Sequence, residues 1–413
     1  MAPSTAIRRL ALAACLLASS ARAQYFKLVT LNTTAFPNAL TLDGTPGGFW
    51  WLPSATASTS YVIHHQGGGW CISLDDCLQR SQTFLGSSRF WADANCSAGS
   101  GQQVCGYDGG PHGYFSFDAA INPLFYDANH VYIAYGDGGS FSGRVADPVP
   151  VPGQPAGTAV HFKGAWILEA VYATLLSPEF GMAAASEVLI GGTSAGGLSV
   201  YLTVDRVAAA IRAAAAAGGH APPRITGMPD AGFFIDAPSF AGPTVYTPLY
   251  EAVAAMQNVT GSVNDACVAH YASVNASDTW RCFMAQYSLP FVATPLFITN
   301  SLADAWQGSN IMDLGCTPTK AGSCSVAQLA YLAGFGGELL AALLSHLPPQ
   351  SAAWLPECWV HPLAETDHFW AGVTVGGDTA GGLFERWYTA PPPANASVPL
   401  VRADTPVWGV NAC

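Results

Sequence analysis

The feature that most constrains this fold is a glycine-rich turn between an apolar strand and a helix. Residues 187–190 form a short apolar run, and apolar residues recur at helical spacing after residue 197. Between them stands Gly192-Thr193-Ser194-Ala195-Gly196, which fits the Gly-x-Ser-x-Gly pattern of a nucleophile elbow. Glycine is expected on both sides of Ser194 because larger side chains would clash with the neighbouring strand and helix. The segment therefore predicts a strand, a tight turn with an exposed serine, and a helix.

Strand-like and helix-like segments alternate along the rest of the chain. Strands separated by helices indicate parallel pairing, because the crossover returns the chain to the same edge of the sheet. Neither an internal repeat nor a clear linker divides the sequence. We therefore expect an α/β fold, with a mostly parallel sheet and helices on both faces, built as one domain over residues 24–413. Strands are predicted for residues 61–65, 131–135, 187–190, 232–236 and 295–299, and helices for residues 164–176 and 199–217.

The charge balance excludes one class of partner. The chain has 413 residues, with 15 Lys and Arg against 27 Asp and Glu, and a formal net charge of −12. Binding of nucleic acid through a basic face is therefore not expected. A polyanionic substrate would also be repelled at long range, unless a local patch of the surface reversed the field.

The first 23 residues have the composition of a secretory signal peptide. Arg8 and Arg9 precede a short apolar run over residues 10–18, and residues 21–23 (Ala-Arg-Ala) provide a small-x-small cleavage site. The apolar run is too short to cross a bilayer. We expect cleavage after Ala23 and secretion of the mature chain to the extracellular space or a cell wall.

The apolar stretch over residues 326–344 is not expected to span a membrane. It carries Glu338 and two adjacent glycines, and the chain ends in Val-Asn-Ala-Cys without an apolar tail. Neither stable membrane insertion nor a lipid anchor of the tail-exchange kind is therefore predicted.

Cysteine usage also favours export. The chain has 11 Cys, and one of them, Cys15, lies in the predicted leader, which leaves an even number for disulfides. Short spacings suggest that Cys71/Cys77, Cys96/Cys105 and Cys316/Cys324 staple loops, although spacing alone leaves the full connectivity open. No Cys-x-x-Cys pair occurs, so a structural zinc site is not expected. Sequons compatible with glycosylation in a secretory pathway stand at Asn32, Asn95, Asn258, Asn275 and Asn395.

A second glycine-rich loop follows the strand predicted at residues 61–65. An ester-cleaving elbow needs backbone donors for a developing oxyanion, one of which is normally the amide of the residue after the nucleophile, here Ala195. Others come from a glycine-rich loop after an earlier strand, and residues 65–70 (His-Gln-Gly-Gly-Gly-Trp) fit that description. The amides of Gly68 and Gly69 are therefore the candidate partners of Ala195 in an oxyanion hole.

The base and the acid have more than one candidate. In this architecture the chain order is serine, acid, histidine. Asp304 follows the strand predicted at residues 295–299, whereas Asp230 and Asp236 flank an earlier strand. Four histidines lie beyond Ser194 at a suitable distance in sequence, and spacing alone does not separate the two strongest, His361 and His368. The other two are His270 and His346.

Several motifs occur together in one order and carry a resemblance to a known family. The ordered set is similar to the pectin acetylesterase family of plants, which also includes the Notum-like carboxylesterases of animals. The resemblance covers roughly residues 60–365, and the Gly/Pro-rich tail over about residues 371–413 has no clear counterpart. The motifs are residues 67–71 with Cys77, residues 136–143, 192–197, 230–234 and 304–307, and Cys358-x-x-His361.

The resemblance implies an α/β-hydrolase fold, secretion, and a Ser-Asp-His esterase without a metal or other cofactor. At the matching positions Ser194 is the nucleophile, Asp304 the orienting acid and His361 the base. The Cys-x-x-His match selects His361 over His368. The glycine-rich loop and the residue after the serine match the family's oxyanion hole.

The substrate is less constrained than the chemistry. The resemblance implies an O-acetylated polysaccharide such as pectin. An alternative is a longer acyl chain on a protein, as in the Notum-like enzymes, which requires a deep apolar pocket. A function of another class is a non-catalytic cell-wall or carbohydrate-binding protein on a hydrolase scaffold. Aromatic residues that could line a sugar cleft or an acyl pocket are Trp50, Trp51, Trp70, Phe141 and Trp306.

Overall fold

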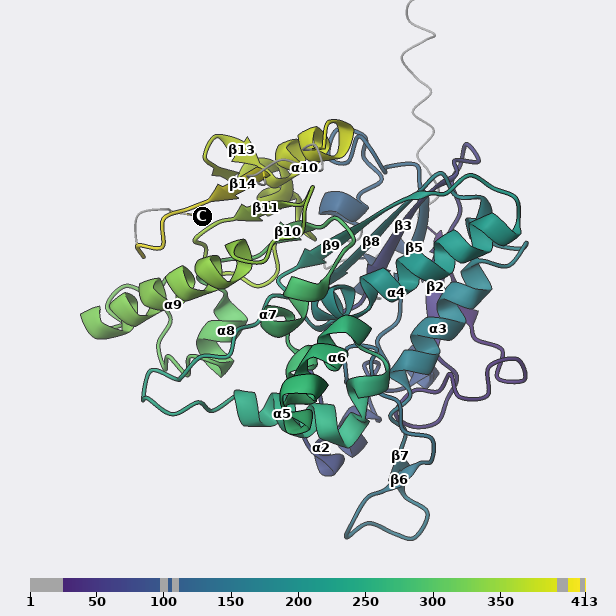
Figure 1. Cartoon of the computed structure of the whole chain (residues 1–413), viewed down its shortest axis with the longest axis horizontal. Helices are drawn as coiled ribbons and strands as arrows, with labels where there is room; N and C mark the ends of the chain where they lie inside the picture. Colours follow the sequence, from purple (N-terminus) through teal and green to yellow (C-terminus); the bar gives the residue numbers. More distant parts are fainter. Residues whose placement is uncertain (1–24, 97–102, 106–110, 392–399, 409–412) are drawn as a thin grey trace, which may run out of the picture.

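A large, mostly parallel β-sheet forms the centre of the molecule. The computed structural model describes residues 25–96, 103–105, 111–391, 400–408 and 413, so the predicted signal peptide and the sequon at Asn395 lie outside the described residues. The sheet formed by the described residues has ten strands in the order β14-β11-β10-β9-β8-β3-β5-β2-β1-β4 (Figure 1). Neighbours from β14 to β5 are parallel, and those from β5 to β4 are antiparallel.

The element bounds place the predicted segments. The strands of the main sheet are β1 (Tyr25–Thr30), β2 (Gly48–Leu52), β3 (Ser60–His65), β4 (Ala94–Asn95), β5 (Asn129–Ile133), β8 (Glu187–Thr193), β9 (Arg224–Asp230), β10 (Phe297–Thr299), β11 (Ala352–Leu355) and β14 (Leu400–Ala403). Two small hairpins pair β6 (Val149–Pro150) with β7 (Ala159–Val160) and β12 (Thr374–Val375) with β13 (Asp378–Thr379). The α-helices are α2 (Leu74–Arg80), α3 (Gly164–Leu175), α4 (Ala195–Ala217), α5 (Thr247–Gln257), α6 (Asp265–Val274), α7 (Ala285–Ser288), α8 (Ala305–Asn310), α9 (Val326–Leu344) and α10 (Ala380–Thr389).

Both faces of the sheet are covered, because the central strands are apolar on both sides. Successive side chains of a strand point to opposite faces. On β8, Leu189 belongs to the core cluster that contains Leu383 and Trp387 of α10, whereas Ile190 belongs to the cluster that contains Leu198 of α4. The two clusters therefore lie on opposite faces of one sheet, as expected for a parallel α/β fold.

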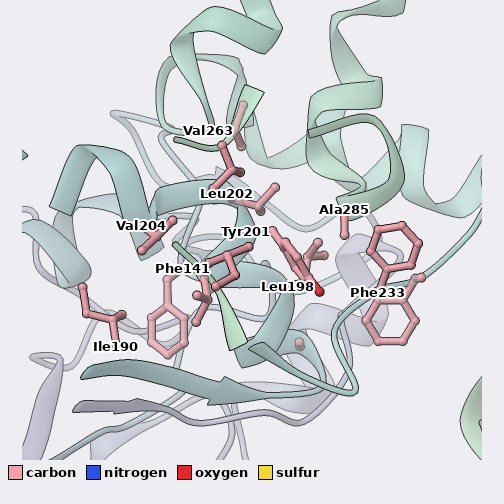
Figure 2. Close-up of a cluster of buried hydrophobic side chains, with 14 of the residues drawn as sticks. Phe141, Ile190, Leu198, Tyr201, Leu202, Val204, Phe233, Val263 and Ala285 are labelled. Atoms are coloured by element: carbon pink, nitrogen blue, oxygen red, sulfur yellow. The ribbon is translucent and has the colours of Figure 1, made fainter. Parts of the chain in front are cut away.

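Helix α4 is the longest of the described helices and its first half is buried. Its N-terminal part lies against the sheet, and α3 lies beside it (Figure 1). Full burial of a large aliphatic or aromatic side chain contributes about 1.5–3 kcal/mol, so this contact fixes the direction in which α4 leaves β8. Figure 2 shows side chains of α4 packing among residues from the surrounding loops and strands: Phe141, Ile190, Leu198, Tyr201, Leu202, Val204, Phe233, Val263 and Ala285.

The predicted α/β-hydrolase type of fold is confirmed, with one strand misplaced. Residues 232–236 were expected to form a strand, but the strand is β9, which ends at Asp230. A Cβ atom on Gly232 would lie 2.4 Å from the carbonyl carbon of Gly197, so this loop packs directly on the start of α4. The apolar character of residues 232–236 therefore reflects a buried loop. The true strand was missed because it contains Gly227 and Pro229, which are rare in central strands.

Residues 371–391 and 400–408 contribute regular structure. Strand β14 extends the sheet by pairing in parallel with β11. On α10, Trp387 is fully buried in the core cluster on that face of the sheet. The glycine and proline content of this segment had hidden both elements in the sequence.

The ten cysteines beyond the predicted leader form five disulfides. The three short-range pairs expected from spacing are confirmed. The remaining pairs connect positions whose partners the sequence left open. The disulfides are Cys71–Cys77, Cys96–Cys105, Cys267–Cys282, Cys316–Cys324 and Cys358–Cys413.

Helix α9 is apolar enough, and at 19 residues long enough, to meet the length and composition test for a membrane span. One side of it packs into the core cluster through Leu332, Phe335, Leu339 and Leu343. A buried core helix passes the same test of length and composition. Length and composition of α9 therefore do not distinguish the two roles.

We predict that the Cys267–Cys282 disulfide stabilises the segment that contains α6. It closes a loop of 15 residues, for which chain entropy gives a loss of about 3 kcal/mol on removal, and both cysteines are fully buried. Guanidinium unfolding of a Cys267→Ala/Cys282→Ala variant measures the loss. Cys316→Ala/Cys324→Ala is the matched control, with a loop of 8 residues and half-exposed sulfurs, and should lose less. A larger loss in the control would contradict the prediction.

Candidate active site

The loops that carry the predicted site residues leave the sheet at one edge. Strands β3, β8, β9, β10 and β11 are parallel neighbours, so their carboxyl ends lie together. In open α/β sheets, ligands bind outside these strand ends. The structure therefore brings the predicted elbow, glycine-rich loop, acid and histidine to one place.

Ser194 lies in a conformation that few residues other than glycine adopt. It connects β8 to α4 with φ 58° and ψ −122°. Such a backbone costs on the order of 1–3 kcal/mol and persists only where the surroundings hold it. A Cβ atom on Gly192 would lie 2.5 Å from the carbonyl oxygen of Gly196, and one on Gly196 would lie 2.0 Å from that of His65. The glycines of the predicted elbow are therefore required by backbone contacts on both sides.

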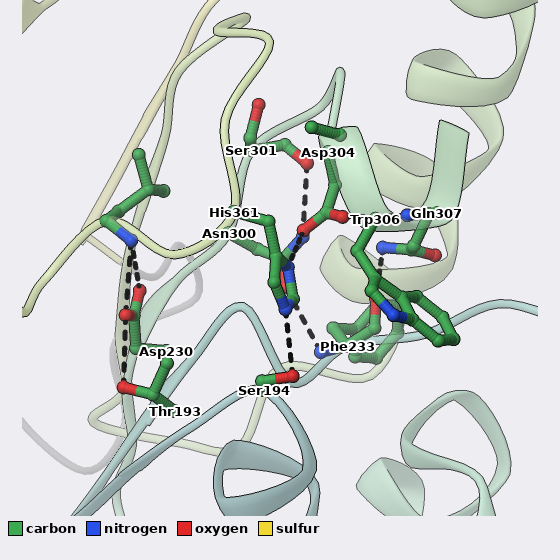
Figure 3. Close-up of polar contacts among 12 residues, drawn as sticks. Thr193, Ser194, Asp230, Phe233, Asn300, Ser301, Asp304, Trp306, Gln307 and His361 are labelled. Atoms are coloured by element: carbon green, nitrogen blue, oxygen red, sulfur yellow. Dashed lines mark hydrogen bonds and ion pairs between the residues drawn. The ribbon is translucent and has the colours of Figure 1, made fainter. Parts of the chain in front are cut away.

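Three side chains meet at this turn, as Figure 3 shows. The Nε2 atom of His361 lies 2.8 Å from the Oγ atom of Ser194. The Nδ1 atom of His361 lies 2.7 Å from Oδ2 of Asp304. These are hydrogen-bonding distances, and they form a continuous chain from hydroxyl to imidazole to carboxylate. His361 is 57 residues from Asp304 and 167 residues from Ser194 in the sequence.

The position of Asp304 follows from its role as the N-cap of α8. Its Oδ1 atom accepts a 2.9 Å hydrogen bond from the amide of Gln307, which leaves Oδ2 for His361. The carboxylate is fully buried. The helix cap therefore holds Oδ1 of Asp304, while Oδ2 orients the imidazole of His361.

The loop that carries His361 is attached to the loop that carries Asp304. The amide of Leu302 donates to the carbonyl of Pro356 at 2.8 Å, and the hydroxyl of Ser301 donates to the carbonyl of Cys358. Cys358 is also bonded to Cys413 at the chain end. These links fix the separation of imidazole and carboxylate independently of Ser194.

The carboxylates around His361 favour its charged form. Burial by itself would lower the pKa of His361, but the charge and hydrogen bond of Asp304 outweigh it, and Asp230 and Glu365 act in the same direction. The net result is that the pKa of His361 is raised above its usual value near 6.5. The protonated form of His361 is therefore stabilised.

Asp230 is a buried carboxyl that supports the site from behind. Both of its oxygens accept from the amide of Leu363, at 3.3 and 3.2 Å, two residues beyond His361. The hydroxyl of Thr299 donates to it at 2.7 Å. Burial raises the pKa of Asp230 to about 6, against the lowering effect of these hydrogen bonds. Asp230 therefore positions the histidine loop, and it does not contact the imidazole as Asp304 does.

A second acid, Glu365, lies next to Asp230 and its side chain is 29% exposed. Burial, followed by the charge of Asp230, raises the pKa of Glu365 to about 8. Its Oε1 atom lies 3.0 Å from Nε2 of His64, whose pKa burial lowers to about 3. His64 is therefore uncharged at neutral pH, so this contact is not an ion pair. Glu365 carried no signal in the sequence, because only the folded chain brings it beside Asp230 and His64.

The predicted oxyanion loop lies against the elbow. A Cβ atom on Gly67 would lie 2.3 Å from the carbonyl oxygen of Thr193 and 3.1 Å from Cβ of Ser194. Gly68 and Gly69 follow with φ of 142° and 64°, which favour glycine. As the first residue of α4, Ala195 has an amide without an intrahelical acceptor. The three candidate donors therefore flank the serine.

A hydrogen-bonded network holds this loop in place. The hydroxyl of Tyr135 donates to the carbonyl of Gly69 at 2.8 Å and accepts from the amide of Ser140 at 2.9 Å. The hydroxyl of Ser140 in turn accepts from the indole Nε1 of Trp70 at 2.8 Å. The amide of Cys71 donates to the carbonyl of Gly138 at 3.1 Å. The glycine-rich segment 136–143 thus supports the oxyanion loop, a role that sequence motifs alone did not reveal.

The rival candidates lie elsewhere. His368 is exposed and its ring contacts Phe369. Asp236 accepts hydrogen bonds from the hydroxyls of Thr247 and Tyr287. His270 is exposed on α6. Of the described histidines, His361 is the one that contacts Ser194.

An open cleft lies next to this site, although Ser194, His361 and Asp304 do not themselves line it. It has a volume of about 420 Å³ and is lined by residues that include Gly69, Trp70, Asp76, Tyr246, Trp306 and Asn310. The ring of Trp306 lies 6.2 Å, centroid to centroid, from that of His361, so the cleft begins beside the imidazole. Aromatic walls with a few polar groups are typical of small-molecule and sugar sites.

A partly exposed serine on a strand-to-helix turn, with histidine and aspartate in hydrogen-bonding order on a parallel sheet, is the arrangement that α/β-hydrolases use. The comparisons with known proteins agree with that class. The chain belongs to the pectinacetylesterase family, whose model matches residues 19–396. The match extends beyond residues 60–365, where the sequence motifs had been recognised.

Curated relatives come from plants and animals. Pectin acetylesterase 5 of Arabidopsis thaliana is 28% identical over 364 residues, which cover 85% of this chain and 77% of the relative. Pectin acetylesterase 4 of the same plant is 27% identical over 403 residues, covering 91% and 88%. The palmitoleoyl-protein carboxylesterase NOTUM of Homo sapiens is 25% identical over 391 residues, covering 93% and 70%. The chain is therefore a carboxylic ester hydrolase.

We predict that kcat/KM for ester hydrolysis rises with pH through an apparent pKa above 6.5. Only the neutral form of His361 can accept a proton, and neighbouring carboxylates raise its pKa. Asp304→Asn removes the principal carboxylate, so the midpoint should move to lower pH while kcat falls about 10³–10⁴-fold. A pH series from 5 to 9 with both proteins measures this. A midpoint that Asp304→Asn leaves in place would contradict the assignment.

Proposed function

We propose that this protein is a secreted serine carboxylesterase that removes O-acetyl groups from a polysaccharide. The observation that supports it most is the hydrogen-bonded sequence of Ser194, His361 and Asp304, next to an open cleft whose wall includes Trp306, the neighbour of His361. Ser194 is the nucleophile, His361 the base and Asp304 the group that orients and stabilises the imidazolium. We further propose that residues 24–413 act as one hydrolase domain after removal of the predicted leader.

The first half of the reaction forms an acyl-enzyme. His361 accepts the proton of the Ser194 hydroxyl through Nε2 as Oγ attacks the ester carbonyl. Asp304 keeps the other ring proton on Nδ1, so that Nε2 is the free acceptor. The tetrahedral intermediate collapses when the imidazolium returns the proton to the leaving sugar oxygen. The acetyl group is then bonded to Ser194.

Backbone amides stabilise the negative charge that develops on the carbonyl oxygen. The proposed donors are the amides of Gly68, Gly69 and Ala195. Removing one donor of an oxyanion hole typically costs about 3–4 kcal/mol of transition-state stabilisation. Because the Tyr135 network fixes the loop, these donors need no rearrangement when charge appears.

The second half of the reaction uses water. His361 removes a proton from a water molecule, whose oxygen attacks the acyl carbonyl, and the serine oxygen leaves with the proton from the imidazolium. Acetate and free enzyme are the products. The reaction requires neither a metal ion nor an organic cofactor, because the three side chains and the backbone amides supply each step.

The aromatic packing next to His361 favours a short acyl group. Phe234 and Trp306 lie edge to face at 5.1 Å between centroids, and Trp70 contacts both, at 5.1 and 5.5 Å. Rings packed in this way fill the interior beside the imidazole. A palmitoleoyl-sized chain would have to displace them or lie along the open cleft. This is the reason for preferring an acetyl ester over the long acyl chain that the name of NOTUM indicates for that relative.

Secretion fits the disulfides and the exposed sequons. Five disulfides are typical of an oxidising compartment. The described sequon residues are all exposed, at Asn32, Asn95, Asn258 and Asn275. An extracellular or cell-wall location is therefore proposed for the mature enzyme.

We expect Ser194→Ala to lower the hydrolysis of p-nitrophenyl acetate by at least ~10³-fold, because no other group can form the acyl-enzyme. The exposed serine Ser273 on α6 provides the matched control, Ser273→Ala, which should retain activity. Both variants should keep the thermal unfolding midpoint of the parent. Turnover retained in Ser194→Ala would show that another residue performs the chemistry. The same result would revive a non-catalytic role for this site.

Acyl-chain length separates the two esterase functions. We expect kcat/KM to be highest for p-nitrophenyl acetate and to fall through the butyrate and octanoate esters, because the ring cluster beside His361 leaves little depth. Steady-state kinetics with the three esters measure this. A maximum at octanoate would favour a Notum-like deacylase instead.

A further inference from the structure

The cleft contains one negatively charged side chain, Asp76, which affects the substrates that it can bind. We propose that it selects an uncharged O-acetylated sugar chain, so that the enzyme deacetylates neutral glycans, or polyuronate whose carboxylates are methyl-esterified, in preference to acetylated polyuronate with free carboxylates. This inference rests on the proposed function, since it concerns the substrate of the same site.

One carboxylate lies in the wall of the cleft. Asp76, in the first turn of α2, lines the cleft together with Trp70, Tyr246 and Trp306. Its Oδ2 atom accepts a 2.9 Å hydrogen bond from the amide of Ile72, which fixes the carboxylate in position. Burial and then the charge of Asp76 raise the pKa of Tyr246, so the carboxylate acts on the aromatic wall.

No positive charge balances it there. None of the described residues that line the cleft is Lys or Arg. Two basic residues elsewhere on the described surface are paired with acids: Arg206 contacts Asp265 at 2.6 Å, and Arg402 contacts Asp378 at 2.6 Å. The local surface therefore does not reverse the field of a chain whose formal net charge is −12.

Arg80 is the cation next to the oxyanion loop, and it is turned inward. Its guanidinium lies over the ring of Tyr135, 5.0 Å from the centroid, and its Nε atom donates to the carbonyl of Leu85 at 3.1 Å. The charge of Arg80 also lowers the pKa of the buried Asp137, partly offsetting the effect of burial. The guanidinium of Arg80 thus faces Tyr135 and the interior, and Arg80 does not line the cleft.

The other wall groups suit a neutral sugar. The rings of Tyr246 and Trp306 lie edge to face at 5.0 Å and present apolar surface to the C–H faces of a pyranose. Ser309 and Asn310 add hydroxyl and amide groups at the same cleft for sugar hydroxyls. A carboxylate on a neighbouring sugar would instead meet Asp76.

The test compares the same polysaccharide with charged and with esterified carboxyl groups. Acetylated polygalacturonate and its fully methyl-esterified form are assayed for released acetate at 0.01 M and 1 M NaCl, where the Debye length is about 30 Å and 3 Å. We expect kcat/KM at 0.01 M to be at least ~10-fold lower for the charged polymer. That deficit should shrink at 1 M, while the neutral polymer changes little.

A pair of neighbouring variants locates the effect. Asp76→Asn keeps an acceptor for the amide of Ile72 but removes the charge, so the ratio of kcat/KM for charged to neutral polymer should rise about 2–5-fold at 0.01 M NaCl. Asp75→Asn removes the same charge from an exposed residue of the same helical turn that does not line the cleft, and should raise that ratio less.

The outcomes separate this inference from the function on which it rests. Equal or better hydrolysis of the charged polymer at 0.01 M, or an equal effect of the two variants, would overturn it. So would turnover of p-nitrophenyl acetate with neither polymer deacetylated, which leaves the esterase function intact. Failure to hydrolyse p-nitrophenyl acetate and both polymers would instead remove the proposed function, and this inference with it.

Discussion

The close approach of three backbone segments around Ser194 is the constraint on which the rest of the site depends. The strand end of β8, the start of α4 and the loop after β3 come so near one another that Cβ atoms on Gly67, Gly192 or Gly196 would lie 2.0–2.5 Å from neighbouring carbonyl oxygens. This packing holds Ser194 in its unfavourable backbone conformation and directs its hydroxyl out of the sheet. The same packing sets the oxyanion loop beside the nucleophile. The same backbone contacts therefore position both Ser194 and the proposed backbone donors beside it.

The carboxylates around His361 are the second feature that defines the site. Asp304 is buried with one oxygen committed to a helix cap, so its other oxygen meets His361 without competition from water. Asp230 accepts a hydrogen bond from the amide of Leu363 and thereby fixes the position of the loop that carries His361. The acids around His361 raise its pKa, which favours the imidazolium of the reaction over the neutral ring. The neighbouring cleft carries Asp76 and no basic side chain among its described lining, which is the basis of the proposed preference for uncharged sugars.

Sequence reasoning succeeded where the signal was local. The elbow, its flanking strand and helix, and the glycine-rich loop each depend on residues adjacent in the chain, and all three were predicted. Prediction from the sequence was weaker where a residue's role depends on contacts with residues far away along the chain. Asp230, Asp236 and Asp304 could not be separated by spacing, because only the fold shows which carboxylate reaches His361. The strand expected at residues 232–236 is a buried loop packed on α4, since burial and strand formation produce the same apolar pattern. Strand β14 and the Cys358–Cys413 disulfide are likewise long-range features.

The most direct measurement of the central claim is covalent labelling by a fluorophosphonate, followed by peptide mass spectrometry. Such reagents react with a serine whose hydroxyl is activated by a base and whose adduct an oxyanion hole can stabilise. The predicted result is one adduct, on the peptide that contains Ser194, which is absent when His361 is replaced by alanine. An adduct on another residue, or ester hydrolysis that continues with Ser194 unlabelled, would contradict the account.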